Sequence, residues 1–158
     1  MIGDEDTITT LYFLNVGISK EHIEKAIISL KMKDIVLFSS IQLKEEVLPY
    51  IQYLKNMNIN IHEIVFIDPF TEKSIEEMIR HMLIIIEKYS GKNVEIVTGL
   101  TGGTNTMAIS FGLTAFIKNL KCNYILNKEK NFIVEIDTFK KLNPKMTLKE
   151  IEEYFKGQ

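Results

Sequence analysis

Residues 95–107, EIVTGLTGGTNTM, have the composition of a loop that holds an anion. The apolar run that overlaps their start, residues 94–97, predicts a short buried strand, and an apolar-periodic helix begins directly after the glycines. Gly99, Gly102 and Gly103 let the backbone approach a ligand closely, and glycine adopts positive φ without strain. The first amides of the helix have no internal partner, and the helix dipole favours negative charge beside them.

Short polar side chains surround these glycines at Thr101, Thr104, Asn105 and Thr106. The spacing fits neither common phosphate-binding motif. A P-loop, GxxxxGK[ST], would need its second glycine at Thr104 with a lysine after it, and the dinucleotide fingerprint GxGxxG is also absent. The alternative interpretation is a structural strand-to-helix turn whose glycines serve close packing.

The composition is that of a globular protein without a strong charge bias. Its 158 residues suit one domain, and 46% hydrophobic and 25% charged residues are ordinary values. A net charge of −2 and a pI of about 6.0 argue against a binder of duplex nucleic acid, although they allow a local anion site. Arg80 is the sole arginine, which nearly excludes phosphate recognition by a guanidinium group.

Cysteine and histidine are too few and too scattered for a metal centre. Cys122, the single cysteine, excludes an internal disulfide and a cysteine-based zinc site. His22, His62 and His81 show no metal-ligand spacing, so we expect no metal and no other cofactor. No apolar run approaches the roughly 18 residues of a membrane span. We therefore expect a cytoplasmic protein without a membrane segment.

Four predicted strands alternate with four predicted helices. The strands are continuous apolar runs, and the helices have apolar residues at spacings of three and four. Ser19 is expected to cap the first helix, and Pro49 to delay or kink the second. The fourth helix has few polar residues and is expected to be covered on several sides. The strands are residues 9–16, 34–39, 62–67 and 94–97, and the helices are residues 19–32, 43–57, about 74–89 and about 104–120.

Two further strands, residues 122–127 and 132–136, flank a charged turn at 128–130 and predict an antiparallel hairpin. A tail with a short amphipathic helix follows. Alternating strands and helices predict a parallel sheet that is covered on both faces. The expected fold class is α/β: a Rossmann-like parallel sheet flanked by helices, with a C-terminal antiparallel β-hairpin.

Ligands of such sheets bind beyond the carboxyl ends of the strands, where the strand order reverses. The segments expected at that edge are residues 15–19, 39–42, 68–71 and 98–107. The glycine loop therefore lies where the topology predicts a site. Asp68, which precedes a proline, is interpreted as a turn residue rather than a catalytic base.

Two junctions of strand and helix carry a resemblance to a known family. They are TGGT at residues 101–104, with Met107 after it, and LNVGISKEHIEKAI at residues 14–27. With the layout above, they resemble the CARF domain, the CRISPR-associated Rossmann fold, over about residues 9–138. Family members usually have a lysine after TGGT, whereas this chain has Asn105, an amide that forms hydrogen bonds but carries no charge.

CARF domains form homodimers that bind cyclic oligoadenylates, ring-shaped second messengers of type III CRISPR antiviral defence, in a pocket across the two-fold axis. The resemblance implies a single CARF-like domain, residues 1–158 with a helical tail at 139–158, that senses a cyclic oligoadenylate. Cyclic tetra-adenylate is the ring expected first. It also implies control of an effector domain or protein that is not present in this chain. The expected ligand-binding residues are Asn15, Val16, Gly17, Ile18, Ser19, Ser39, Ser40, Gln42, Thr98, Leu100, Thr101, Gly102, Gly103, Thr104, Asn105 and Met107.

A second function remains open, because free-standing CARF domains can cleave the ring. In that metal-independent reaction a ribose 2′-OH attacks the neighbouring phosphate and leaves a cyclic 2′,3′-phosphate end. Ser19 and Asn105 are the candidate catalytic side chains, with the amides of Gly102 and Gly103 stabilising charge. No strong general base or cation is visible, which favours the sensor. Outside the family, the third interpretation is a flavodoxin-like domain that binds a mononucleotide.

Overall fold

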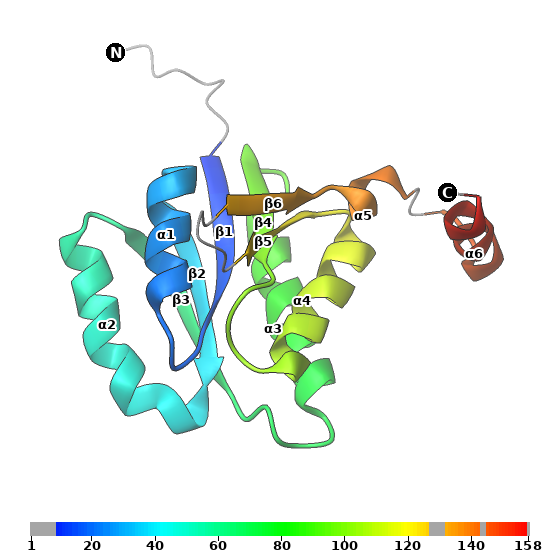
Figure 1. Cartoon of the computed structure of the whole chain (residues 1–158). Coiled ribbons are helices and arrows are strands. Elements are labelled where there is room, and N and C mark those ends of the chain that lie inside the picture. The colour runs from blue at the N-terminus through cyan, green and yellow to red at the C-terminus, as the bar shows by residue number, and fades with distance from the viewer. Residues whose placement is uncertain (1–8, 127–131, 143–144, 158) are drawn as a thin grey trace, which may run out of the picture.

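The structure, a computed structural model, describes residues 9–126, 132–142 and 145–157. Strands and helices alternate along most of this part of the chain and build one sheet with helices on both faces (Figure 1). The strands are β1 Thr9–Val16, β2 Asp34–Ser40, β3 Asn60–Ile67, β4 Val94–Gly99, β5 Lys121–Leu126 and β6 Phe132–Ile136. The helices are α1 Glu21–Leu30, the 3₁₀ turn η1 Ile41–Leu43, α2 Lys44–Asn56, α3 Ser74–Tyr89, α4 Asn105–Lys118, α5 Thr138–Lys141 and α6 Leu148–Lys156.

The strand order of the sheet is β3-β2-β1-β4-β5-β6. Neighbouring strands are parallel except β5 and β6, which form an antiparallel pair. This arrangement confirms the predicted class, a Rossmann-like parallel sheet with a C-terminal hairpin; the charged turn at 128–130 lies outside the described residues. The order reverses between β1 and β4, which is the switch point of the sheet. A flavodoxin sheet, by contrast, has β3 next to β1.

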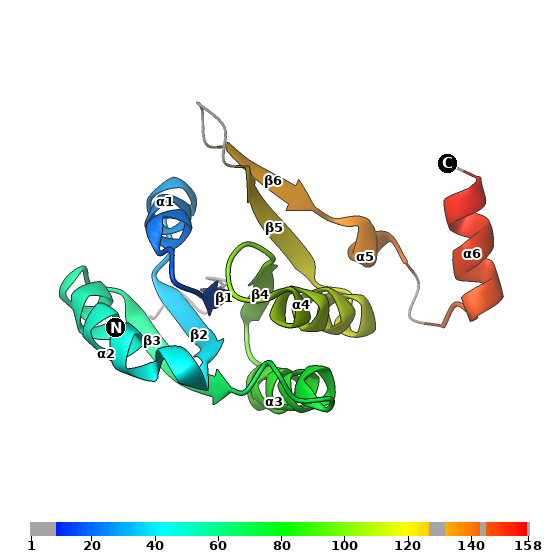
Figure 2. The same ribbon diagram turned by 60° about the horizontal axis from the view of Figure 1, so that its bottom comes forward.

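The interior strand β2 is buried on both faces along most of its length, and its successive residues point to opposite sides of the sheet. In β2, Ile35 and Leu37 pack with α1 and α2, whereas Val36 and Phe38 pack with α3 and α4. Phe38 meets Phe111 of α4 edge-on, with ring centroids 5.2 Å apart. Figure 2 shows the two helix pairs on opposite sides of the sheet. These two cores fix the ends of β1 and β4, and therefore the loops that follow them.

The first helix differs from its prediction. α1 begins at Glu21, and Lys20 occupies its N-cap position without a side-chain cap bond, so Ser19 does not cap the helix. The helix ends at Leu30 because Lys31 adopts the left-handed conformation, with φ of 50°. The apolar spacing was read correctly, but it does not set the ends of a helix to the residue.

The second and fourth helices bear on two further expectations. Pro49 lies inside α2, which begins at Lys44, so of the two predicted effects of the proline the late start is wrong and a kink stays a prediction. On α4, Ile109, Leu113 and Ile117 are 51%, 43% and 51% exposed, so the prediction of cover on several sides is wrong for the chain by itself. A scarcity of polar residues shows that a helix is apolar, but it does not supply neighbours for every face.

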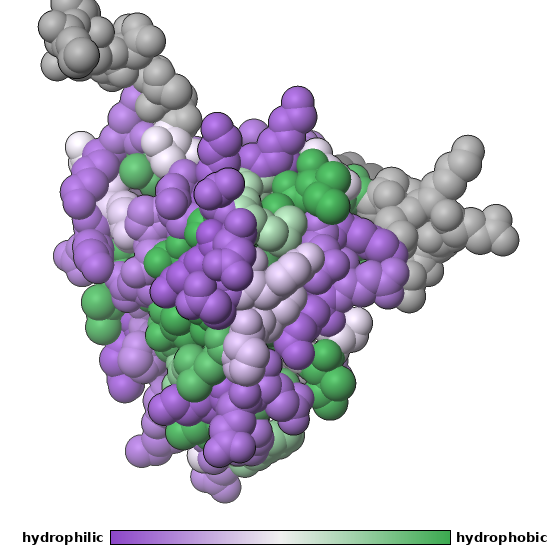
Figure 3. Space-filling view, turned by 90° about the vertical axis from the view of Figure 1, so that its left-hand side faces the viewer, coloured by the Kyte–Doolittle hydropathy of each residue, from purple (hydrophilic) through white to green (hydrophobic). Residues whose placement is uncertain are grey.

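The outer faces of the two helix pairs differ in polarity. On the side of α1 and α2, hydrophilic side chains predominate and hydrophobic ones are scattered between them (Figure 3). On α4, by contrast, residues 105–117 contain no charged side chain. None of the helices in the described part of the chain is long and apolar enough to cross a membrane.

Candidate functional site

The loops that follow β1 and β4 touch each other at the switch point. A Cβ atom on Gly17 would lie 3.1 Å from the amide nitrogen of Gly103. This distance is shorter than ordinary van der Waals contact, so a side chain at position 17 would push the two loops apart by a few tenths of an ångström. The loops therefore form one surface at the carboxyl edge of the sheet, where α/β sheets bind ligands.

The glycines of the β4–α4 loop are required by both conformation and space. Gly102 and Gly103 have φ of 95° and 68°, the left-handed region that other residues rarely adopt. A Cβ on Gly102 would collide with the His22 ring and lie 2.7 Å from the carbonyl oxygen of Asn15. A Cβ on Gly103 would lie 3.1 Å from Met107 Sδ. The two glycines thus let the loop lie directly on β1 and the first turn of α1.

Hydroxyl groups hold the same loop in place. Thr104 caps α4, and its Oγ1 accepts a hydrogen bond from a backbone amide in the first turn of the helix at 3.3 Å. Thr101 Oγ1 accepts a hydrogen bond from the Ile125 amide at 2.7 Å, which ties the loop to β5. Thr106 Oγ1 donates to the Pro69 carbonyl at 3.2 Å, which ties the start of α4 to the β3–α3 turn. The loop is therefore anchored on three sides.

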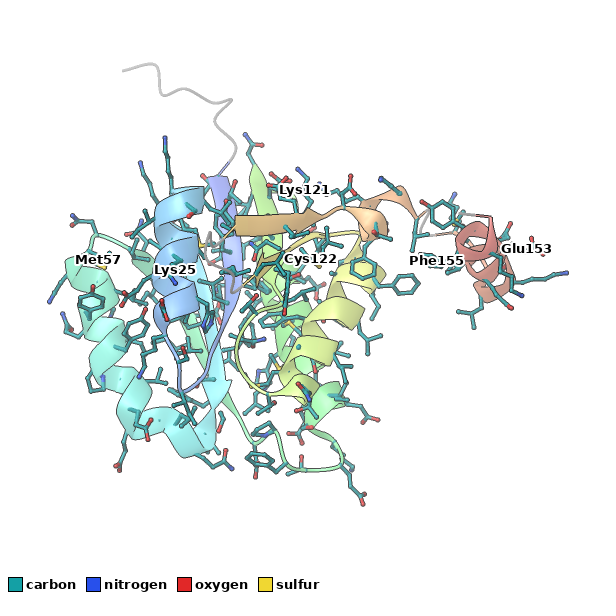
Figure 4. The ribbon with its side chains drawn as sticks, viewed as in Figure 1. Lys25, Met57, Lys121, Cys122, Glu153 and Phe155 are labelled. Carbon is teal, nitrogen blue, oxygen red and sulfur yellow. The ribbon has the colours of Figure 1, made fainter. Side chains whose placement is uncertain are left out.

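A polar hollow of about 280 Å³ lies between the two loops and the start of α1. Its lining includes Ser19 and Thr101 from the loops and His22 and Lys25 from α1. Figure 4 shows Lys25 on α1. Lys25 forms an ion pair with Glu21, which also lines the hollow, and a hydrogen bond from Lys25 lowers the pKa of the Glu21 carboxyl. The hollow therefore combines hydroxyl groups with a cation.

A second, apolar hollow of about 340 Å³ shares Gly17, Ile18 and Gly103 with the first, so these residues form a ridge between the two. Phe70 from the β3–α3 turn and Met107 from α4 also line it. Ile18 and Phe70 are 80% and 75% exposed. Exposed aliphatic and aromatic side chains beside a hollow can cover the flat face of a nucleotide base.

A buried amide lies beneath the two loops. Asn15 is 1% exposed, and neither polar atom of its side chain has a hydrogen-bond partner among the described residues. Its backbone carbonyl accepts a hydrogen bond from His22 Nε2 at 3.2 Å, so the neutral ring carries its proton on Nε2. Burial lowers the pKa of His22, and this hydrogen bond opposes the shift only in part. His22 is therefore neutral at pH 7.

The hollows bring together most of the residues expected from the sequence. Asn15 and Leu100 lie outside both linings, and Asn105, the first residue of α4, is exposed and belongs to neither. The expected residues that line one or both hollows are Val16, Gly17, Ile18, Ser19, Ser40, Gln42, Thr101, Gly102, Gly103, Thr104 and Met107.

Two of the expected residues are fully buried and bonded within the protein. Ser39 Oγ donates a hydrogen bond to the Val16 carbonyl at 2.7 Å, which links the ends of β1 and β2. Thr98 Oγ1 lies 3.1 Å from Cys122 Sγ, between β4 and β5. Both side chains support the strand ends from behind the hollows.

Several lining residues were missed by sequence reasoning. His22 and Lys25 are three residues apart on α1, and their spacing could have placed them on one face of the predicted helix. Phe70 lies in a turn where its backbone amide donates a hydrogen bond to Asp68 Oδ1 at 3.1 Å. This bond agrees with the interpretation of Asp68 as a turn residue. No local pattern signals Phe70 as a lining residue. The missed residues are Glu21, His22, Lys25, Leu43, Phe70 and Ile125.

The chemistry of the site is that of an anion site beside a base site. The backbone of the glycine loop, the Lys25 ammonium and the hydroxyl groups that line the polar hollow can hold a phosphate. The apolar hollow next to them can hold a flat base. Within the described residues, no group of three histidine, cysteine, aspartate or glutamate side chains could hold a metal ion.

Comparisons with known proteins give a match at the level of the fold. No protein-family model and no curated protein matches the sequence. Among solved structures, the chain is similar to Enterococcus italicus Csm6 bound to cyclic hexa-2′-fluoro-hexa-dAMP, with a TM-score of 0.63 and 16% sequence identity. The match covers 80% of this chain and 36% of that chain, so this chain corresponds to about a third of the other's length. At this identity the likeness shows the fold alone: the chain has a CARF-like Rossmann fold.

Proposed function

We propose that the chain is a single CARF-like domain that binds a cyclic oligoadenylate across a homodimer and controls an effector. The observation that carries the proposal is the pair of adjoining hollows, one polar and one apolar, on either side of the ridge that includes Gly17 and Gly103. A ring of adenylates alternates phosphate and ribose with flat bases, so it needs both kinds of hollow side by side. The similar Csm6 structure holds a cyclic hexa-2′-fluoro-hexa-dAMP, which agrees with this ligand class.

The polar hollow suits a phosphate and its ribose. The backbone of Gly102 and Gly103 lines this hollow and can approach an anion closely, and Lys25 adds the cation that Asn105 does not provide. Lys25 already pairs with Glu21, so a bound phosphate would compete with that carboxylate for the ammonium. Ser19, which is exposed and does not cap α1, can donate its hydroxyl to the ligand.

The size of the site supports a dimer. A hollow of about 280 Å³ is at the lower end of ligand pockets and holds only part of a ring of four or six adenylates. A second copy related by a two-fold axis would place an identical pair of hollows against the rest of a symmetric ring.

Calorimetry with cyclic tetra-adenylate and cyclic hexa-adenylate tests the proposal. We expect one ring to bind per two chains, with the ring recovered intact by chromatography afterwards. Linear oligoadenylate of the same length serves as the control ligand, and it should bind more weakly because it is not preorganised. Failure of both rings to bind would contradict the proposal and leave the glycine loop as a structural turn.

One observation favours the second candidate function, cleavage of the ring. His22 lines the polar hollow, and because Nε2–H is donated to Asn15, the neutral ring has Nδ1 as its proton acceptor. As a general base it would take the proton of a ribose 2′-OH while O2′ bonds to phosphorus and the bond from phosphorus to O5′ breaks. O5′ takes up a proton, and a cyclic 2′,3′-phosphate remains. Linear products that form with wild-type protein but not with His22→Gln would establish this reaction.

A further inference from the structure

The C-terminal helix α6 presents an apolar face that the described part of the chain leaves uncovered. Leu148, Ile151 and Phe155, hereafter the α6 face, recur at the spacing of one side of a helix. Leu148 is 82% and Phe155 49% exposed, and no residue of α6 is buried. The helix is nevertheless well terminated, because Thr147 and Glu150 form a capping box at its start. Figures 1 and 4 show α6 standing away from the sheet and its helices.

A second uncovered apolar face lies on α4. Ile109, Leu113 and Ile117, hereafter the α4 stripe, recur every four residues and are about half exposed. The helix bears no charged residue until Lys118. Such a stripe has the width and polarity of a seam between two helices.

The two faces match in length and charge. The α4 stripe spans nine residues, roughly 12 Å of helix from first to last Cα, and the α6 face spans eight residues, roughly 10 Å. α6 carries three glutamates and two lysines, so its net charge is negative. The C-terminal end of α4 and the neighbouring β5 and α5 carry four lysines, and within the described residues their ion pairs involve two carboxylates, Glu95 and Asp137. The lysines are Lys118, Lys121, Lys140 and Lys141.

The position of α5 brings the chain close to the stripe before α6 begins. The Phe139 ring of α5 meets Phe116 of α4 edge-on, with centroids 6.1 Å apart. Leu142, the last residue of the described range 132–142, is 3% exposed, so its side chain anchors the chain at this point. From Leu142 the six residues to Leu148 reach at most roughly 20 Å. α6 therefore begins within that reach of α5, which contacts α4, yet it stands apart from its own α4 (Figures 1 and 2).

We propose that α6 of one chain docks on the α4 stripe of a second copy, and the reverse, so that two chains exchange their C-terminal helices. The exchange is a two-fold, self-complementary contact of the kind that closes a dimer. It buries both apolar faces twice, which supplies the driving force. The inference goes beyond the proposed function, because the exchange joins two chains whether or not a ring is bound.

Disulfide trapping tests which chain receives α6. Leu113→Cys is made in one tagged chain and Phe155→Cys in a differently tagged chain, and the two are produced together; native Cys122 is 1% exposed and protected. Under mild oxidation we expect a disulfide between the two different chains, and none in wild-type protein. A bond between two Leu113→Cys chains would show α4 pairing with α4 and overturn the proposal. A double variant, with Leu113→Cys and Phe155→Cys in one chain, that closes its disulfide within that chain would also overturn the proposal. So would the absence of any disulfide.

Sedimentation of the full chain without ligand tests the energetics. Phe155→Asp should raise the dissociation constant of the dimer roughly tenfold or more, since it places a charge in the apolar contact. Glu153→Asp, on the polar side of the same helix, keeps the negative charge; it is the matched control and should leave the dimer unchanged (Figure 4). A Phe155→Asp chain that dimerises like wild type would overturn the exchange. Ring affinity measured on the same samples keeps failure of the exchange separate from failure of the proposed function.

Discussion

Gly17 and Gly103 hold the two loops of the candidate site at contact distance, because a Cβ on Gly17 would lie 3.1 Å from the Gly103 amide nitrogen. That nitrogen belongs to the backbone expected to hold an anion. The same contact lies between the polar and the apolar hollow. Any side chain at this point therefore changes the spacing of the loops and the shape of both hollows together.

Gly103→Val should abolish ring binding while the fold survives. Valine at φ of 68° is strained, and its Cβ would crowd Met107 and Asn15 at 3.1–3.3 Å. We expect the free energy of unfolding to fall by roughly 1–3 kcal/mol. Calorimetry with both rings and thermal unfolding measure the two effects on one sample.

Gly112→Ala is the matched control in α4. A Cβ at Gly112 meets no atom within 4 Å, so alanine should leave ring binding unchanged. It should raise the free energy of unfolding by about 0.5–1 kcal/mol, because it removes helical glycine. If Gly103→Val bound the ring normally, the glycine loop would be a structural turn and nothing more.

Lys25→Met should weaken ring binding roughly tenfold to a hundredfold. The substitution keeps most of the apolar stem but removes a charge-assisted contact to phosphate. Lys55→Met, at the end of α2 and outside both hollows, is the control and should bind like wild type. Titrations at two salt concentrations should also show a weaker salt dependence for Lys25→Met. Equal affinity of the two variants would remove Lys25 from the phosphate site.

The sequence predicted the parts of the fold and site that depend on local pattern. Continuous apolar runs located the strands, and the glycines at 102 and 103 located the β4–α4 loop, because both properties reside in neighbouring residues. Thr104 was recognisable as a short polar residue at a helix start, and it is the N-cap of α4. The edge of the sheet followed from the alternation of strands and helices.

The positions of side chains that depend on tertiary packing could not be predicted from local pattern. Lys25 enters the polar hollow because α1 packs with Ile23 and Ile27 inward, and the rotation of the helix then turns Lys25 toward the glycine loop. Phe70 reaches the apolar hollow through a turn whose direction depends on β3 and α4 together. Ser19 had the residue type of a cap, but the helix starts two residues later, and the cap preference of a serine does not decide where a helix begins.

Asn105→Lys should tighten ring binding several-fold. The residue is exposed at the first position of α4, and a lysine there would add a charge that can reach the mouth of the site. The helix dipole opposes a cation at this position by about 0.3–1 kcal/mol, so a small loss of stability should accompany the gain. Asn105→Gln, which lengthens the side chain without charge, is the control. Unchanged affinity of Asn105→Lys would place this position away from the phosphates.

The stability of the protein should decline as pH falls below 6.5, and His22 should account for part of the decline. Burial holds the pKa of His22 below its ordinary value of 6.5, so the unfolded chain takes up a proton at a higher pH than the folded chain. Between 6.5 and the folded pKa the proton therefore favours unfolding. Above this pH window the neutral ring keeps its hydrogen bond to the Asn15 carbonyl, and the contribution of His22 to the free energy of unfolding is fully present.

Thermal unfolding between pH 5 and pH 8 should show this dependence in wild-type protein and a flatter one in His22→Gln. Glutamine can still donate to the Asn15 carbonyl but does not titrate, so the variant separates the hydrogen bond from the proton. His81→Gln is the control, because His81 is exposed on α3 and should retain the wild-type slope. A slope that persists in His22→Gln would mean that other groups set the acid sensitivity. Ring binding of wild type, His22→Gln and His81→Gln at pH 5.5 and 7.5 should show whether a charged imidazole beside Gly102 also moves the glycine loop. His22→Gln cannot acquire that charge, whereas wild type and His81→Gln can.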